Sequence, residues 1–264
     1  MPSYRFALRP RWILSHLFVL LLVLTMVNLG FWQLRRLDER KDFNHAVRTN
    51  AAAEAVPVTT LLPTNATSAD VRDAEWRRVT VSGTYRADAD VLVANRVLEG
   101  QPGYWIVTPI TTADSGVIAV VRGFVTRALV ASGGLAPTAP PGGTVTVTGF
   151  VQRPRHGGRF ASDREAGLAQ ISTVDVDALA ARWGSALAPY WLQLTEQAPA
   201  VADEVLQPVP RPTLDNGPHL SYAIQWFTFS MIAVIGYPLI LRRNARARAL
   251  DGAGNAVGTG EGLG

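Results

Sequence analysis

Hydrophobic residues concentrate in two long runs, one near each end of the chain. Residues 12–31 read WILSHLFVLLLVLTMVNLGF, residues 220–241 read LSYAIQWFTFSMIAVIGYPLIL, and neither run contains a charged residue. Twenty helical residues at about 1.5 Å each span about 30 Å, the thickness of a bilayer core. The pattern predicts an integral membrane protein with transmembrane helices over residues 12–32 and 219–241. A cleaved signal peptide is the alternative for the first run, but the run is long and no A-x-A site follows it.

Basic residues next to the second run set the predicted orientation. Four arginines lie within residues 242–248, whereas mainly Arg211 precedes the run within reach. Because positive residues favour the cytoplasmic side, the C-terminus is expected in the cytoplasm, and two spans place the N-terminus there as well. We therefore predict a multi-pass protein of the cell (plasma) membrane, with cytoplasmic residues 1–11 and a cytoplasmic basic, Gly-rich tail over 242–264. The tail is expected to be disordered from Asp251 onward.

Between the two runs, the hydrophobic period changes to two. Residues 33–75 are predicted as a juxtamembrane helix, continuing the first span to about residue 50, and a linker over 51–74. From Trp76 onward, β-branched and aromatic runs separated by Gly, Pro, Asp and Ser predict strands at 76–86, 90–97, 103–110, 116–125, 143–152 and 189–194. Helical spacing predicts one helix at Val174–Trp183 and a shorter helix or turn at Thr126–Leu135. The predicted fold is an extracytoplasmic, mostly antiparallel β (α+β, barrel-like) domain over 76–210, flanked by the two transmembrane helices.

Composition excludes several classes of function. The chain has no cysteine, which rules out disulfides, thiolate catalysis, Cys-ligated zinc and iron–sulfur clusters. Lys41 is the single lysine, and no basic stripe interleaved with aromatics predicts nucleic-acid binding. The motifs G-x-S-x-G and H-E-x-x-H and a phosphate loop are absent, and the acidic residues form no paired carboxylates. We therefore predict a protein that is not an enzyme, with no catalytic residue and no metal site.

The four histidines differ in their sequence surroundings. His219 follows Gly217-Pro218 at the start of the second span, and Tyr222 and Trp226 recur after it at helical spacing. This pattern is typical of an interfacial aromatic belt, and it also suits a haem-facing site, because neutral imidazole is a common iron ligand. His16 lies near the opposite membrane face, so the two cannot share one haem. His45 is expected to face solvent, and the loop RPRHGGRF around His156 is either a solvated basic loop or a contact for an anion or partner.

Several segments, in order along the chain, carry a resemblance to a known family. They are LGFWQLRRLDERK from Leu29, WRRVTVSGTY, VLVANR, GQPGYWIVTPI, VVRGFV and HLSYAIQWF from His219. Together they resemble the surfeit locus protein one family of cytochrome c oxidase assembly factors. In that family the fifth segment commonly reads V-N-R-G-W, so this chain departs from it at Val121 and Phe124. Five matching residues are interpreted as fold determinants, with the glycines expected in turns and the proline at a strand end: Gly103, Tyr104, Pro109, Arg122 and Gly123.

The resemblance implies assembly rather than turnover. Family members help to mature the catalytic subunit of haem–copper oxidase, and bacterial members have been linked to haem a handling. It implies a transient haem a cofactor at His219, with Tyr222 and Trp226 beside it. The expected partners are the cytochrome c oxidase catalytic subunit, a wider respiratory complex and membrane lipid, with no nucleic acid.

Three hypotheses follow for the function. The first is an assembly or maturation factor that aids haem a insertion or stabilises the catalytic subunit, with Gly30 allowing the two spans to pack closely. The second is a permanent accessory subunit of the oxidase or of a respiratory supercomplex, without a haem role. The third is an unrelated membrane-anchored enzyme. Stoichiometric co-purification with mature oxidase would distinguish the second hypothesis from the first.

Overall fold

The computed structural model describes residues 5–63, 65–133, 135–162, 164–165, 167–200 and 205–258. The chain divides into two compact units. A helical unit contains residues 1–44 and 214–264, and a β unit contains residues 45–213.

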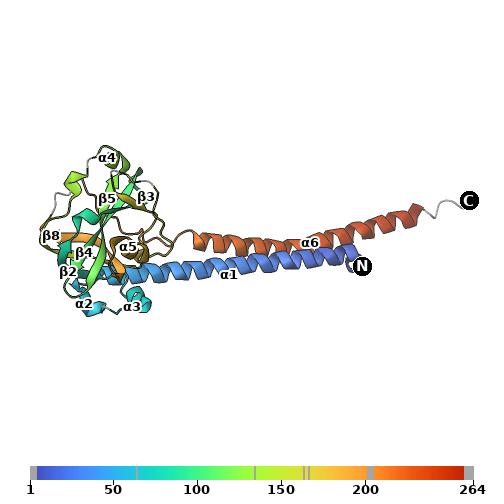
Figure 1. Ribbon diagram of the computed structural model, residues 1–264. Coiled ribbons are helices and arrows are strands. Elements are labelled where there is room, and N and C mark those ends of the chain that lie inside the picture. The colour runs from blue at the N-terminus through green and yellow to red at the C-terminus, as the bar shows by residue number, and fades with distance from the viewer. Residues whose placement is uncertain are drawn as a thin grey trace, which may run out of the picture. The chain divides into compact units, whose positions relative to one another are not determined.

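Two long helices make up most of the helical unit. After a 3-10 turn (η1, Arg5–Leu8), α1 runs over Pro10–Ala52 and α6 over His219–Gly258, and the two lie side by side in opposite directions (Figure 1). Both are long and apolar enough to cross a membrane. Large apolar side chains project from them, with Leu14 69% exposed and Ile232 60% exposed. A core helix of a soluble protein would bury such side chains, so these helix surfaces need an apolar environment that the chain itself does not supply.

The C-terminal tail differs from expectation. Residues 251–258 were predicted to be disordered, but they form the last turns of α6. The reason is that these turns continue a helix already formed, and propagation is easier than nucleation. Residues 259–264 lie outside the described part of the chain.

The β unit is one sheet of eight strands that closes on itself. The order is β1-β2-β6-β8-β5-β4-β3-β7, and β2 also pairs with β4, so β2, β6, β8, β5 and β4 form a closed ring. The strand pairs β1–β2, β3–β7 and β5–β8 are parallel, and the other pairs are antiparallel. The predicted barrel-like, mostly antiparallel domain is therefore confirmed. The strands are β1 (Val56–Pro57), β2 (Arg78–Tyr85), β3 (Val91–Leu98), β4 (Gln101–Thr112), β5 (Gly116–Thr126), β6 (Thr144–Gln152), β7 (Ala169–Ile171) and β8 (Leu187–Ala198).

The strands supply residues to three apolar clusters, two of which receive alternating residues of β5. All five ring strands contribute to the first cluster, which identifies it as the barrel interior; from β5 these residues are Ile118 and Val120. The intervening Ala119 and Val121 belong to a second cluster with residues of β3 and of α5 (Val176–Trp183). The strand β5 is thus buried on both faces. The predicted helix at 174–183 is confirmed, and α4 (Arg127–Ala131) is the predicted shorter helix.

The stretch 51–74 was predicted to be a linker, and the structure corrects this interpretation. It contains β1, α2 (Val58–Leu61) and α3 (Ser68–Asp73). Val58, Leu62 and Val71 are buried with the barrel interior, and Thr67 and Asp70 form a capping box at the start of α3. These elements are too short to produce a periodic hydrophobic pattern, which is why the sequence read as a linker.

Gly103 and Gly123 were predicted as turn residues, and the structure corrects this interpretation: they lie inside β4 and β5, where they allow close backbone approach. Pro109, predicted at a strand end, also lies inside β4. A Cβ atom on Gly103 would lie 2.1 Å from the carbonyl oxygen of Val125 on the neighbouring strand. A Cβ atom on Gly123 would lie 2.8 Å from the carbonyl oxygen of Gln207, whose backbone pairs with Phe124. Any other residue at these positions would push the paired segments apart.

Candidate functional site

The segment before α6 is fastened to α1 by polar contacts. The Asp215 carbonyl oxygen accepts hydrogen bonds from Arg40 Nε at 3.0 Å and from Asn44 Nδ2 at 2.9 Å. The Asp215 carboxylate also accepts from the Gly217 N–H at 3.1 Å. Because Asn44 is buried and bonds Asn216 as well, the chain enters α6 from a fixed position on α1.

His219, the first residue of α6, is held in one tautomer. Its Nδ1 lies 2.9 Å from Gln33 Oε1 on α1. Since an amide oxygen can only accept, Nδ1 carries the proton and donates to it. The lone pair of the neutral imidazole is then on Nε2, near the backbone of Gly217, whose built Cβ would stand 3.3 Å from that nitrogen. Among the described residues no hydrogen bond is made to Nε2, and a histidine whose Nδ1–H is bonded can offer Nε2 to a metal.

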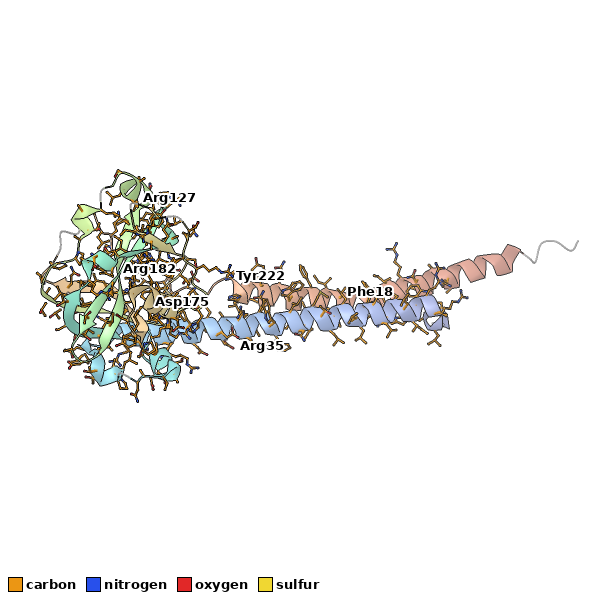
Figure 2. The ribbon with its side chains drawn as sticks, in the orientation of Figure 1. Phe18, Arg35, Arg127, Asp175, Arg182 and Tyr222 are labelled. Carbon is orange, nitrogen blue, oxygen red and sulfur yellow. The ribbon has the colours of Figure 1, made fainter. Side chains whose placement is uncertain are left out.

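The aromatic residues after His219 follow a neighbouring stripe of α6. His219 shares the face of Ala223 and Phe227 that packs against α1, whereas Tyr222 and Trp226 stand one position earlier on the helix. Tyr222 is exposed in the first turns of α6 (Figure 2), and the Trp226 ring is half-buried. The helix therefore places His219 and the two aromatic rings along neighbouring stripes of α6.

His16 has no open nitrogen. Its Nδ1 lies 2.7 Å from the Tyr237 hydroxyl on α6, and its Nε2 lies 3.2 Å from the Ala7 carbonyl oxygen. Because the carbonyl can only accept, Nε2 carries the proton and Nδ1 accepts from the tyrosine. Nδ1 thus joins α1 to α6, whereas Nε2 ties α1 to the preceding turn η1. Of these two histidines, only His219 presents a free ligand atom.

The middle of the helix pair is packed at Gly30. A Cβ there would lie 2.6 Å from the Phe227 ring, and Phe31 meets the same ring edge to face at 5.4 Å between centroids. The prediction that Gly30 allows close approach is confirmed. His219 is therefore positioned by a tightly packed helix pair.

In the β unit, a charged network is buried at the barrel. Arg122, whose side chain is 1% exposed, donates to Thr108 Oγ1 at 2.7 Å, the Thr138 carbonyl at 2.6 Å and Asp90 Oδ2 at 3.1 Å. Asp90 also accepts from the Thr108 hydroxyl, and the guanidinium lies 5.9 Å from the Tyr85 ring. Burial raises the pKa of Asp90, and Arg122 opposes that rise. The network satisfies its own charges, so we assign it to stability, as expected for Arg122.

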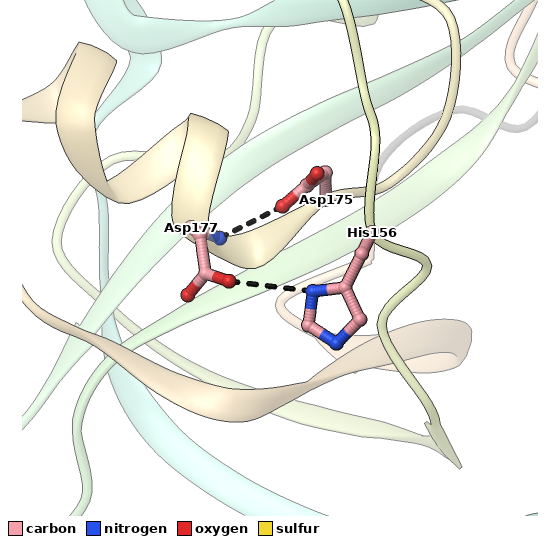
Figure 3. A group of neighbouring side chains, drawn as sticks. All are labelled: His156, Asp175 and Asp177. Atoms are coloured by element: carbon pink, nitrogen blue, oxygen red, sulfur yellow. Dashed lines mark hydrogen bonds and ion pairs between the residues drawn. The ribbon is translucent and has the colours of Figure 1, made fainter.

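A second group of titratable residues caps α5 (Figure 3). Oδ1 of Asp175 accepts from the N–H groups of Asp177 and Ala178, and Oδ2 accepts from Gly158 N–H. The exposed His156 lies 3.4 Å from the Asp177 carboxylate. Although these three side chains lie close enough for a metal, the oxygens of Asp175 are engaged by backbone donors, and the group is a helix cap with one exposed ion pair. His45 is exposed on α1, as predicted.

Sequence reasoning missed the partners of these residues. Gln33 was read only as the start of a charged helix, and Asn44 and Asp215 were given no role. The available signal was their helical spacing. Gln33 lies one turn before the buried Leu37 and Asn44 lies two turns after it, so both polar residues share the buried face of α1.

The chain is similar to known proteins. A model of the SURF1 family matches residues 20–231, a range that includes most of α1, the β unit and the start of α6 with His219. An uncharacterized SURF1-like protein of Mycobacterium tuberculosis is 34% identical over 260 residues, covering 97% of this chain and 92% of the relative. A SURF1-like protein of Monosiga brevicollis is 29% identical over 242 residues, covering 84% and 86%. The cytochrome oxidase assembly protein SHY1 of Saccharomyces cerevisiae is 31% identical over 104 residues, covering 39% of this chain and 26% of the yeast protein.

Proposed function

This chain belongs to the SURF1 family, and from that premise we propose that it is a non-enzymatic assembly factor for haem–copper cytochrome c oxidase. The name of the yeast relative, a cytochrome oxidase assembly protein, supports this role. The partner is the catalytic subunit of the oxidase, which the chain stabilises while the subunit matures, within the wider respiratory complex. A stable β barrel joined to two apolar helices suits a chaperone that docks rather than one that turns over a substrate.

The helices α1 and α6 anchor the protein in the cell membrane. Their exposed apolar side chains are lipid-facing in this proposal, and the arginines of 242–248 keep both termini in the cytoplasm. The β unit then lies on the extracytoplasmic side. The starting point of α6 is consequently at the outer membrane surface, where a maturing membrane subunit can reach His219.

The single observation that carries a haem role is the open Nε2 of His219. The Nδ1–H bond to Gln33 supplies the neutral tautomer that iron ligation needs, so Nε2 of His219 would hold the haem iron. Tyr222 and Trp226 would offer ring faces to an apolar macrocycle. Haem a, when bound, supplies the redox iron that the oxidase requires. His219, with Tyr222 and Trp226 beside it, would hold the haem transiently before it passes to the catalytic subunit.

Absorption spectroscopy tests this site directly. The full chain, purified in mild detergent from cells that make haem a, should show a haem band that is lost in His219→Ala and kept in His45→Ala, the exposed control on α1. Gln33→Leu should weaken and broaden the band because both tautomers become populated, whereas Gln33→Glu keeps an acceptor and should rescue it. A haem-free wild-type preparation, or a band unaffected by His219→Ala, would refute the haem role.

Gene deletion tests the assembly role separately. Deletion should lower oxidase activity and the amount of mature catalytic subunit, and normal activity would refute the proposal. The protein should co-purify with immature oxidase, in less than one copy per oxidase. Stoichiometric recovery with mature, active oxidase would instead identify a permanent accessory subunit.

A further inference from the structure

The β unit contains a basic cleft that the proposed function does not use. Its volume is about 470 Å³, and it lies between α3 and the loop that follows β6. Four of its lining residues can carry positive charge and one is acidic; they are Arg72, Arg153, Arg155, His156 and Glu75. Ser68 adds a hydroxyl group, and prolines 154 and 189 with Val71 complete the lining.

The loop that supplies most of this charge is held in place. The Arg153 guanidinium pairs with Glu75 at 2.9 Å, and that carboxylate is mostly buried. The backbone N–H of Arg155 donates to the Val174 carbonyl at 3.1 Å, and Gly158 N–H donates to Asp175. The arginines are therefore presented from a fixed backbone on one wall, with Arg72 opposite them on α3.

The positive charge of the cleft exceeds its internal compensation. Glu75 balances Arg153, but among the described residues neither Arg72 nor Arg155 has a carboxylate partner. Arg155 also acts on Arg96, which packs over the Trp105 ring at 4.3 Å and has a buried Nε without a hydrogen-bond partner. Burial lowers the pKa of Arg96, and the like charge of Arg155 lowers it further. A bound anion would relieve this repulsion.

We propose that this cleft binds a phosphate-bearing ligand. One planar guanidinium can fill both oxygens of a carboxylate, whereas a tetrahedral phosphate accepts from donors on several sides. Arg72, Arg155 and Ser68 approach from two walls, which suits the tetrahedral group. The volume exceeds that of a single ion, so the ligand is a phosphorylated small molecule or the headgroup of an anionic phospholipid. The proposal does not depend on oxidase assembly or on haem.

Calorimetric titration tests the shared chemistry. The full chain in an uncharged detergent is titrated with inorganic phosphate at constant ionic strength, with citrate as the carboxylate comparison. Phosphate should bind saturably and more tightly than citrate, and Arg155→Gln or Arg72→Gln should weaken it about tenfold or more. The control is Arg182, an exposed arginine of α5 outside the cleft (Figure 2). The substitution Arg182→Gln removes the same charge and should change the phosphate affinity less than about twofold. Unchanged melting temperatures would establish that the variants fold.

A second arm distinguishes the two sources of phosphate. Wild type and Arg155→Gln are placed in nanodiscs of phosphatidylcholine, with or without phosphatidylglycerol. A rise in melting temperature with phosphatidylglycerol in the wild type alone identifies a lipid headgroup, and phosphate binding without this rise identifies a soluble phosphorylated molecule. The proposal is overturned if neither arm responds, if citrate binds more tightly, or if Arg182→Gln weakens binding as much as Arg155→Gln.

Discussion

Replacing Arg122 with methionine should strongly destabilise the β unit. The substitution keeps most of the apolar stem and removes three hydrogen bonds, leaving the Asp90 carboxylate, 12% exposed, without its cation. Breaking one partner of a buried ion pair costs about 3–5 kcal/mol. A domain of this length loses about 3 °C of melting temperature per kcal/mol, so the expected fall is about 9–15 °C.

A double-mutant cycle separates the ion pair from general damage. In Arg122→Met/Asp90→Leu both charges are gone, so the double variant should melt above the single variant. The control Arg78→Met removes an exposed pair with Glu196, 3.2 Å apart, and should cost less than about 1 kcal/mol. Melting is followed in detergent by tryptophan fluorescence and near-ultraviolet circular dichroism. A single variant within about 2 °C of wild type, or a double variant less stable than the single one, would refute the reasoning.

The pH dependence of Arg122→Met gives an independent check on the same carboxylate. Burial raises the pKa of Asp90, and without Arg122 the hydrogen bond from the Thr108 hydroxyl is left to oppose that rise. A raised pKa in the folded state means that the folded protein binds the proton more tightly than the unfolded chain. The folded variant is therefore relatively more stable below the ordinary aspartate pKa, and it loses this stability as the pH rises through the raised value. The difference in melting temperature between wild type and Arg122→Met should therefore become smaller as the pH is lowered.

Two further substitutions test the cap and the close strand approach. Asp175→Ala should cost about 1–2 kcal/mol through loss of the α5 cap. Burial opposes ionisation of Asp175, but backbone donors lower its pKa overall. The difference in melting temperature between wild type and Asp175→Ala should therefore shrink below about pH 4. A difference that grows on acidification would contradict this. Gly103→Ala places a Cβ against the Val125 carbonyl and should lower the free energy of unfolding by more than about 2 kcal/mol. The control Gly100→Ala adds a Cβ in open space at a φ of +78°, and in the same melts it should lower the free energy of unfolding by about 1 kcal/mol.

Much of the fold could be predicted because single segments carry its pattern. The alternation of Val79 and Val81 indicates a strand with one buried face, and both residues line the barrel interior. The spacing of Val176, Leu179 and Trp183 indicates a helix, and all three are buried in α5. In such segments, local periodicity and tertiary burial agree.

The remaining features depend on contacts between distant segments. Nothing in the sequence of β8 indicates that it lies parallel to β5. Likewise, the sequence does not indicate that Arg122 of β5 pairs with Asp90, which precedes β3. The interpretation of His219 as a ligand stays a prediction, but its tautomer depends on Gln33, which is far away in sequence. A single-sequence pattern cannot supply this pairing, because it exists only after α1 and α6 have packed.

The position of β8 also has a consequence for biosynthesis. Although β5 and β6 are neighbours in chain order, β8 lies between them in the sheet. Both strands therefore present unpaired edges to solvent until residue 198 has left the ribosome. Non-local pairing of this kind is slow and leaves nascent chains prone to aggregation. The β unit thus remains vulnerable from the completion of β5 until β8 has been made, and α6 is the next helix made once the ring can close.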